Sequence, residues 1–366
     1  MLRFLKLIGM LLFLSTANAI EVTDLYQAKV VVTSQSLYEK NKALKQAMRQ
    51  VLLKVGGQES VLNNKEIKKA LKNYQQFIAQ FSYKREKKHT VLVAQFDENK
   101  VNNLFYQAGL PLWGNLRPQI LLWLVEESGL ERQILAESSS SVLPKIVQEF
   151  SQQRGLPISL PVMDLTDIEA ISIADIWGRF ITPVKLASRR YQAEAIVIFR
   201  LSNSSLLPAE FFANENCDIL CQRQHYALDW RLFTQGQTLE QGTQTHSYQG
   251  SNKTALFKQA LKDMTREIYQ YYALNVNDSH QVDIDVTNIN SLSRYAEVYN
   301  FLNDLSSVAS VQLISAQGEN RRFRLNLLGS KQTLLASLKL NKYLRQYIDP
   351  LAKVDNDSVP IFYWEK

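Results

Sequence analysis

The stretch Gln119–Val125 has the sequence QILLWLV, in which six apolar residues follow one another without interruption. A strand covered on one face alternates apolar and polar residues, whereas a strand covered on both faces is apolar throughout. The run is far shorter than the roughly 20 residues that a membrane-spanning helix needs. We therefore expect a fully buried strand, and we expect it to open a domain.

Strands and helices alternate after this stretch, which is typical of an α/β domain with a mixed sheet. A second buried strand is expected at Ala195–Leu201. Helices are expected at Ser141–Arg154, where Pro144 suits a first turn, and from Ser251 to Tyr272. The segment Pro111–Pro118 has two prolines and a glycine and is a candidate linker. We assign residues 111–274 to this domain.

A smaller α+β domain is expected before the linker, over residues 20–110. Its first helix has apolar residues at helical spacing between Ala43 and Val55 and should stop at Gly56–Gly57. Asn63 or Asn64 can cap a second helix. Two strands of a hairpin are then expected at Phe81–Arg85 and Thr90–Phe96.

Residues 275–366 are expected to form a third module. Apolar alternation predicts a strand over Val282–Val286. Further patterns predict two helices, the second over Leu334–Leu344, and three more strands, the last at Val359–Trp364. The order βαββαβ is that of a ferredoxin-like sandwich. The whole chain is therefore expected to be α/β (α+β) with three modules.

Residues 1–19 have the features of a cleaved secretory signal. Arg3 and Lys6 precede the apolar run Leu7–Leu14, and Ala17–Asn18–Ala19 supplies the small residues that a cleavage site needs. Cleavage would start the mature chain at Ile20, without a membrane-spanning segment. We therefore expect a periplasmic protein.

The positive charge is confined to the first domain. Residues 20–110 hold 15 Lys and Arg against 8 Asp and Glu, a net charge of +7, whereas residues 111–366 hold 25 against 27. A basic domain is commonly a nucleic-acid binder, but export argues against such a partner. An acidic envelope protein or an anionic envelope surface is the expected partner. No particular oligomeric state is indicated.

Basic residues gather in two places within this domain, on the second predicted helix and in the hairpin that follows it. They are Lys65, Lys68, Lys69 and Lys72 on one helical stripe, and Lys84, Arg85, Lys87 and Lys88 in the hairpin. They predict a docking surface for an anionic partner. The alternative is a solvated helix face beside a polar turn.

No catalytic, metal or cofactor site is indicated. The chain has no Gly-x-Ser-x-Gly turn, no phosphate-binding glycine loop and no pair of histidines at zinc-binding spacing. An acidic cluster contains Asp164, Asp167, Glu169 and Asp175. It can bind Ca²⁺ or act as an acid/base pair, but helix capping explains it better. Cys217 and Cys221 can form a local disulfide in an oxidising compartment, although their spacing is not that of a redox motif.

Five segments, taken in order, resemble one family of exported gammaproteobacterial proteins. They are VLLKVGG (Val51–Gly57), RPQILLWLVEE (Arg117–Glu127), LPVMDLTD (Leu160–Asp167), ADIWG (Ala174–Gly178) and ASRRYQAEAIVIFRL (Ala187–Leu201). The family is the domain-of-unknown-function 2066 family. The resemblance implies periplasmic placement, and it implies no activity and no catalytic residue.

A second resemblance concerns the middle domain alone. The segment Tyr191–Ile198 is similar to one in the amino-terminal domain of the Tol-system propeller protein and in related envelope domains. Those domains bind other proteins and catalyse nothing, and the likeness is one of fold. The expected function is a non-catalytic interaction or scaffold module of the cell envelope. The alternatives are an envelope hydrolase with dispersed catalytic residues and a carrier of apolar ligands.

Overall fold

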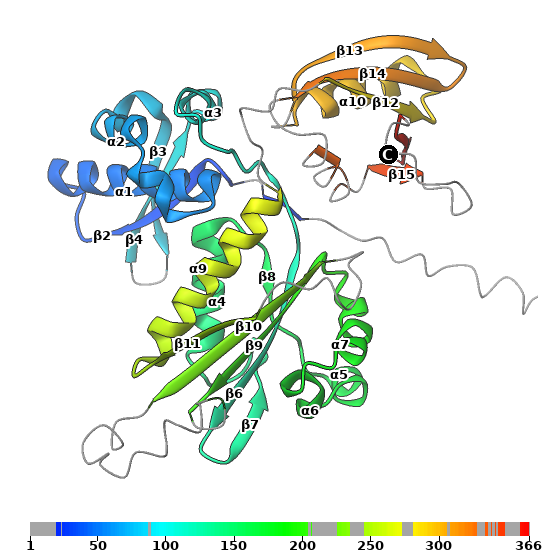
Figure 1. Cartoon of the computed structure of the whole chain (residues 1–366). Coiled ribbons are helices and arrows are strands. Elements are labelled where there is room, and N and C mark those ends of the chain that lie inside the picture. The colour runs from blue at the N-terminus through cyan, green and yellow to red at the C-terminus, as the bar shows by residue number, and fades with distance from the viewer. Residues whose placement is uncertain are drawn as a thin grey trace, which may run out of the picture.

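Three main sheets and one short strand pairing make up the computed structural model (Figure 1). It describes residues 20–22, 24–86, 89–203, 206, 225–234, 245–272, 281–305, 308–327, 334–335, 338, 341, 343–347 and 359–365. The three sheets take their strands from successive parts of the chain and each packs against helices. The expected fold class, several α/β modules in one chain, is confirmed.

The central sheet contains the stretch that predicted a buried strand. β6 (Ile120–Ser128) runs parallel to β9 (Ala195–Ser202) and to the short β8 (Ile158–Ser159), and antiparallel to β7 (Glu131–Ile134). β10 (Tyr226–Thr234) pairs antiparallel with β9 and with β11 (His246–Gly250). The sheet is therefore mixed, as the alternation of elements predicted.

Helices cover both faces of this sheet (Figure 1). α4 (Leu143–Arg154) and α9 (Lys253–Tyr272) pack on one face, and α5 (Leu165–Ala170), α6 (Ile173–Trp177) and α7 (Ile181–Ser188) pack on the other. Successive residues of β6 enter the two cores in turn, Ile120 on the α9 side and Leu121 on the α7 side. Burying each such side chain stabilises the fold by about 1.5–3 kcal/mol.

The first domain is a three-stranded antiparallel sheet with helices on one face. The strand order is β2 (Gln27–Val32), β4 (His89–Phe96) and β3 (Ile78–Glu86). α1 (Leu37–Gly56) buries its predicted apolar stripe against the sheet and ends where Gly57 adopts a left-handed conformation.

Two short helices complete this domain. The side chain of Asn64 caps α2 (Lys65–Lys72) by accepting a hydrogen bond from the N–H of Glu66 at 2.8 Å. Asp97 caps α3 (Glu98–Gln107) in the same way. Two 3₁₀ segments, η2 (Glu59–Asn63) and η3 (Tyr74–Phe77), connect α1 to α2 and α2 to β3.

The third sheet has the order β13–β14–β12–β16–β15. The expected first half is present, as β12 (Gln281–Thr287), α10 (Leu292–Asn303), β13 (Val308–Gln317) and β14 (Asn320–Leu327). The second half differs from the ferredoxin-like order, because it contains two strands, β15 (Leu344–Tyr347) and β16 (Ile361–Trp364).

Neither of these strands matches the expected last strand in both position and direction. Two strands of one sheet that are joined by a helical crossover run parallel to each other. In the four-stranded order the last strand would therefore run antiparallel to β12. β15 has that direction but lies at the sheet edge, whereas β16 lies between β12 and β15 and runs parallel to β12. The four-stranded expectation is corrected to five strands.

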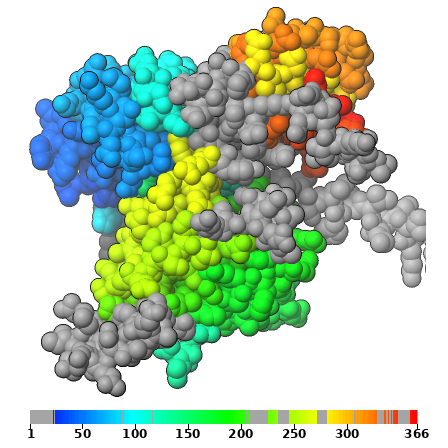
Figure 2. Space-filling view, viewed as in Figure 1, coloured from blue at the N-terminus to red at the C-terminus, as the bar shows by residue number. Residues whose placement is uncertain are grey.

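The first and middle domains meet in a buried joint. β1 (Ile20–Glu21) pairs with β5 (Leu116–Arg117), and the N–H of Trp113 bonds to the carbonyl of Val55 at 2.9 Å. Arg117 is fully buried there. In Figure 2 the blue first domain abuts the yellow helix α9. The segment Pro111–Pro118, the candidate linker, runs between α3 and β6, and most of its residues are buried.

Candidate functional site: the groove between α2 and α3

The predicted lysine stripe lies on the solvent side of α2. Lys65, Lys68, Lys69 and Lys72 are all exposed, while Ile67 and Ala70 on the same helix are buried. None of the four lysines forms an ion pair with a carboxylate in the part of the chain that the structure describes. The stripe is therefore a set of uncompensated positive charges on one helix face.

The basic residues of the hairpin are separated from this stripe. Lys84 and Arg85 are exposed on β3, and because side chains alternate along a strand they point to opposite faces of the sheet. Lys87 and Lys88 lie outside the described residues. The structure therefore gathers the four lysines of α2 and does not bring Lys84 or Arg85 into the same site.

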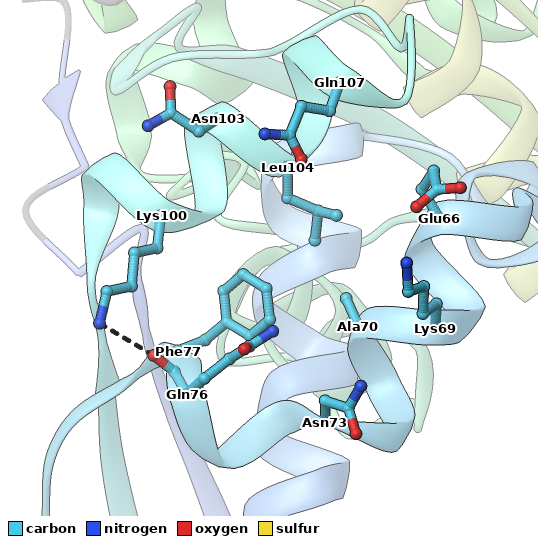
Figure 3. Close-up of a pocket in the computed structure, with 10 residues that line it drawn as sticks. All are labelled: Glu66, Lys69, Ala70, Asn73, Gln76, Phe77, Lys100, Asn103, Leu104 and Gln107. Atoms are coloured by element: carbon cyan, nitrogen blue, oxygen red, sulfur yellow. Dashed lines mark hydrogen bonds between the residues drawn. The ribbon is translucent and has the colours of Figure 1, made fainter.

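A shallow groove runs between α2 and α3, and we call it the α2–α3 groove (Figure 3). Its volume is about 430 Å³, and Phe77 and Leu104 lie at its centre. Lys69 and Lys100 stand on opposite sides of it. The lining residues are Glu66, Lys69, Ala70, Asn73, Gln76, Phe77, Lys100, Asn103, Leu104 and Gln107.

Two helices build most of the groove, and their lining residues have the same spacing along the sequence. The lining residues of α2 and its C-cap are Glu66, Lys69, Ala70 and Asn73, and those of α3 are Lys100, Asn103, Leu104 and Gln107. Each set follows the i, i+3, i+4, i+7 pattern of one helix face. Of these residues only Lys69 belongs to the predicted lysine stripe. The repeated polar spacing on the two helices is present in the sequence, but it indicates a shared groove only once α3 is known to lie beside α2.

The groove is positively charged and rich in carboxamides. Lys100 donates a hydrogen bond from Nζ to the carbonyl of Gln76 at 3.0 Å, and its Nζ lies 3.8 Å from the Asp97 carboxylate. Glu66 is the single carboxylate of the lining. Asn73, Gln76, Asn103 and Gln107 each carry an amide that can donate and accept hydrogen bonds, as a peptide group does. The lining contains no serine, cysteine or histidine.

The acidic cluster of the middle domain has a structural role. Asp164 caps α5, and Arg190 forms hydrogen bonds to both of its carboxylate oxygens, at 2.6 and 2.8 Å. The Arg190 guanidinium holds the pKa of Asp164 at about 2. Asp167 is fully buried and accepts a hydrogen bond from the hydroxyl of Tyr191. Capping, the explanation that the sequence favoured, is what the geometry shows.

The other features considered in the sequence are Asp175, a metal site, the two cysteines and a membrane-spanning segment. Asp175 forms a capping box with Ser172 at the start of α6. No group of three or more His, Cys, Asp and Glu suited to a metal occurs among the residues that are described. Cys217 and Cys221 lie outside them. Over the same part of the chain, no helix is long and apolar enough to cross a membrane.

The comparison with known families identifies the region that holds the groove. A family model described as "Domain of unknown function (DUF8605)" matches residues 19–114. This span contains β2, β3, β4 and all three helices of the first domain, and every residue that lines the α2–α3 groove. No curated protein matches the chain. The matched domain is therefore the basic one.

Proposed function

We propose that this chain is a non-catalytic interaction module of the bacterial cell envelope, and that its first domain docks an acidic protein segment on α2 and in the α2–α3 groove. The single observation that carries the proposal is the composition of the groove. Lysines on both walls suit acidic side chains, and four carboxamides suit the peptide groups between them. The resemblance to the domain-of-unknown-function 2066 family and the signal sequence support the envelope as the compartment.

Electrostatic docking predicts a salt-dependent affinity. Poly-L-glutamate is a suitable probe, because it carries carboxylates on a peptide backbone. Its affinity for the chain should fall steeply between roughly 50 and 500 mM NaCl as the Debye length shortens. An affinity that is unchanged across this range would contradict the proposal.

Matched charge variants locate the surface. Replacing Lys65, Lys68 and Lys69 of α2 by Gln should weaken poly-L-glutamate binding by about tenfold or more at low salt. The control removes three positive charges from the exposed face of α1, at Lys42, Lys45 and Arg49. Equal losses from both triple variants would show a general charge effect instead of a site.

The carboxamides distinguish a protein partner from an anionic surface. The variant Asn103→Leu with Gln107→Leu should weaken poly-L-glutamate binding and leave binding to vesicles containing phosphatidylglycerol unchanged. The same loss for both probes would favour a lipid surface. The compartment has a separate test: the exported chain should begin at Ile20, and a full-length chain in the cytosol would contradict it.

A further inference from the structure

A second groove lies between the first two domains, along the edge of β2. It has a volume of about 430 Å³ and is bounded by β2 and α1 on one side and by α4 on the other. Gln27 and Lys29 contribute from β2, Gln50 from α1, and Gln152 and Gln153 from α4. Its size is within the range of ligand-binding pockets. We call it the β2–α4 groove.

The edge of β2 that faces away from β4 has free peptide groups. The carbonyl of Tyr26 accepts a hydrogen bond from the N–H of Phe96, which places Tyr26 in a bonded pair with β4. Because bonded and non-bonded pairs alternate in an antiparallel ladder, the peptide groups of Gln27, Lys29 and Val31 point away from β4. Those of Gln27 bond locally, its N–H to the carbonyl of Asp24 and its carbonyl to Nζ of Lys54.

The outward peptide groups of Lys29 and Val31 lack the local hydrogen bonds that those of Gln27 form. On the outer side of β2, no hydrogen bond to the N–H or C=O of Lys29 or Val31 is made by any residue that the structure describes. Both residues are exposed, and Lys29 also lines the groove. An exposed row of unpaired peptide groups is a template for an added strand.

The position of α4 is fixed by the joint between the domains. Arg154 of α4 donates to the carboxylate of Glu59 at 3.2 Å, and Lys262 of α9 pairs with the same carboxylate at 2.9 Å. The Arg154 side chain is almost fully buried. α4 therefore forms a fixed wall of the groove beside the β2 edge.

The residues that line the groove indicate which charge and polarity a bound segment would have. The charged groups of the lining are already compensated, since Lys29 pairs with Glu86 at 2.8 Å, Lys54 lies 3.6 Å from the Asp24 carboxylate, and Glu149 lies 3.9 Å from Lys145. The glutamines at positions 27, 50, 152 and 153 offer both donors and acceptors. The groove has no uncompensated charge to attract an acidic segment, and its polar lining does not suit an apolar one.

We propose that the β2–α4 groove binds an extended, uncharged polar segment of a partner protein, which adds to the first sheet as a strand beside β2. Main-chain hydrogen bonds to Lys29 and Val31 provide the affinity, and the four glutamines contact the side chains. This site is separate from the α2–α3 groove. Because it does not depend on net charge, its binding persists at a salt concentration that abolishes docking of an acidic probe.

Peptide selection provides the probe. A displayed library of random peptides of roughly 12 residues is selected on the chain from Ile20 onward, in about 0.5 M NaCl to suppress charge-driven binding. The enriched peptide is synthesised and its affinity is measured by calorimetry. We expect enriched sequences without net charge that bind with little dependence on salt.

A proline variant isolates the main-chain contact. Lys29→Pro removes the outward N–H, and proline is tolerated on a strand edge whose N–H faces solvent. It should weaken the selected peptide at least tenfold. Lys29→Ala, which removes the same side chain and keeps the N–H, should change the affinity by less than about twofold. Equal affinities for the two variants would overturn strand addition.

A blocking variant tests the groove independently of the strand. Gln153→Trp fills the space from α4 and should reduce peptide affinity at least tenfold. Gln148→Trp places the same side chain at another groove, which Gln153 does not line, and should have no effect. A library that yields no peptide preferring the unmodified chain to Gln153→Trp would overturn the proposal. Poly-L-glutamate should bind these variants at low salt as it binds the unmodified chain, because the α2–α3 groove is unchanged in them. A loss of its binding in these variants would contradict the separation of the two sites.

Discussion

The guanidinium of Arg117 lies 4.0 Å from the centroid of the Trp113 ring, inside the joint between the first two domains. Its Nε donates to the carbonyl of Gly114 at 2.6 Å, and one terminal nitrogen donates to the carbonyls of Lys54 and Trp113 at 2.9 and 2.8 Å. No carboxylate among the described residues pairs with it. The carbonyl of Lys54 belongs to the last turn of α1, where the helix dipole favours a cation such as the Arg117 guanidinium.

Removing this side chain should loosen the joint. Arg117→Ala leaves three buried carbonyls without their donor and uncovers the Trp113 ring, so we expect a loss of about 3–5 kcal/mol in the free energy of unfolding. Urea unfolding followed by circular dichroism measures it. If the joint couples the domains, the variant should also unfold in more steps than the unmodified chain does.

Arg117→Lys is the matched control, because it keeps the charge and loses the planar fork that bonds several carbonyls at once. The free energy of unfolding of Arg117→Lys should lie between those of Arg117→Ala and the unmodified chain. A stability of Arg117→Ala within about 0.5 kcal/mol of the unmodified chain would show that the joint does not depend on this residue.

Gly57 makes a second contribution to the joint. It has φ of +65°, and a Cβ at this position would lie 2.2 Å from the ring of Tyr269. Gly109 also follows a helix and has φ of +63°, but a Cβ there would meet nothing within 4 Å. Gly109→Ala should therefore cost only the strain of the left-handed conformation, about 1–2 kcal/mol.

Gly57→Ala adds a clash within the interface to the same strain, so we expect it to cost at least about 1 kcal/mol more. Thermal and urea unfolding of the two variants give the comparison. Equal losses would mean that Tyr269 moves away freely and that α9 is not held against the first domain.

The sequence identified elements better than it identified contacts between them. The apolar run after Gln119 predicted a fully buried strand because neighbouring residues of β6 enter two different cores. The prolines and the glycine of Pro111–Pro118 predicted a connection between domains, but they contain no information that Arg117 bonds to Lys54. Such contacts depend on how two domains pack, which local spacing does not encode.

The third sheet shows that short strands are hard to predict from sequence periodicity. Leu344 was expected to end a helix, yet it begins β15, a strand of four residues. A period of two repeats only twice over that length, so its pattern is too brief to distinguish from a helix end. For the candidate site, the lysine stripe could be predicted from α2 alone, whereas Lys100 and the carboxamides required knowing that α3 lies beside α2.

Charge reversal at the two ends of α2 should separate stability from binding. Lys65 begins the helix, where the dipole disfavours a cation, and Lys72 ends it, where the dipole favours one. Lys65→Glu should raise the free energy of unfolding by about 0.3–1 kcal/mol, and Lys72→Glu should lower it by a similar amount. Both should weaken poly-L-glutamate binding severalfold at low salt, because both remove a positive charge from the stripe.

The combination is informative because a solvated helix face and a docking surface predict different results. If the stripe is only a solvated face, the two reversals still differ in stability but leave poly-L-glutamate binding as it is in the unmodified chain. Chemical denaturation and a binding titration on the same two samples make the distinction.

Glu194 should make stability depend on pH. Burial raises its pKa to about 7, although the N–H of Gln119 donates to its carboxylate at 2.6 Å. The folded chain therefore holds this proton more tightly than the unfolded chain, in which the pKa is about 4.3. The contribution to stability is complete below that value, is lost progressively as the pH rises towards 7, and stays constant above it.

Glu194→Gln keeps an acceptor for the Gln119 N–H and cannot ionise. At pH 8 it should be more stable than the unmodified chain by about 1–3 kcal/mol, and the difference should shrink as the pH falls from 7 towards 4.5. Glu169→Gln, at an exposed position of the same domain, is the control and should follow the unmodified chain at every pH. Urea midpoints measured at several pH values test this, and a constant difference between Glu194→Gln and the unmodified chain would show that the carboxyl does not titrate with folding.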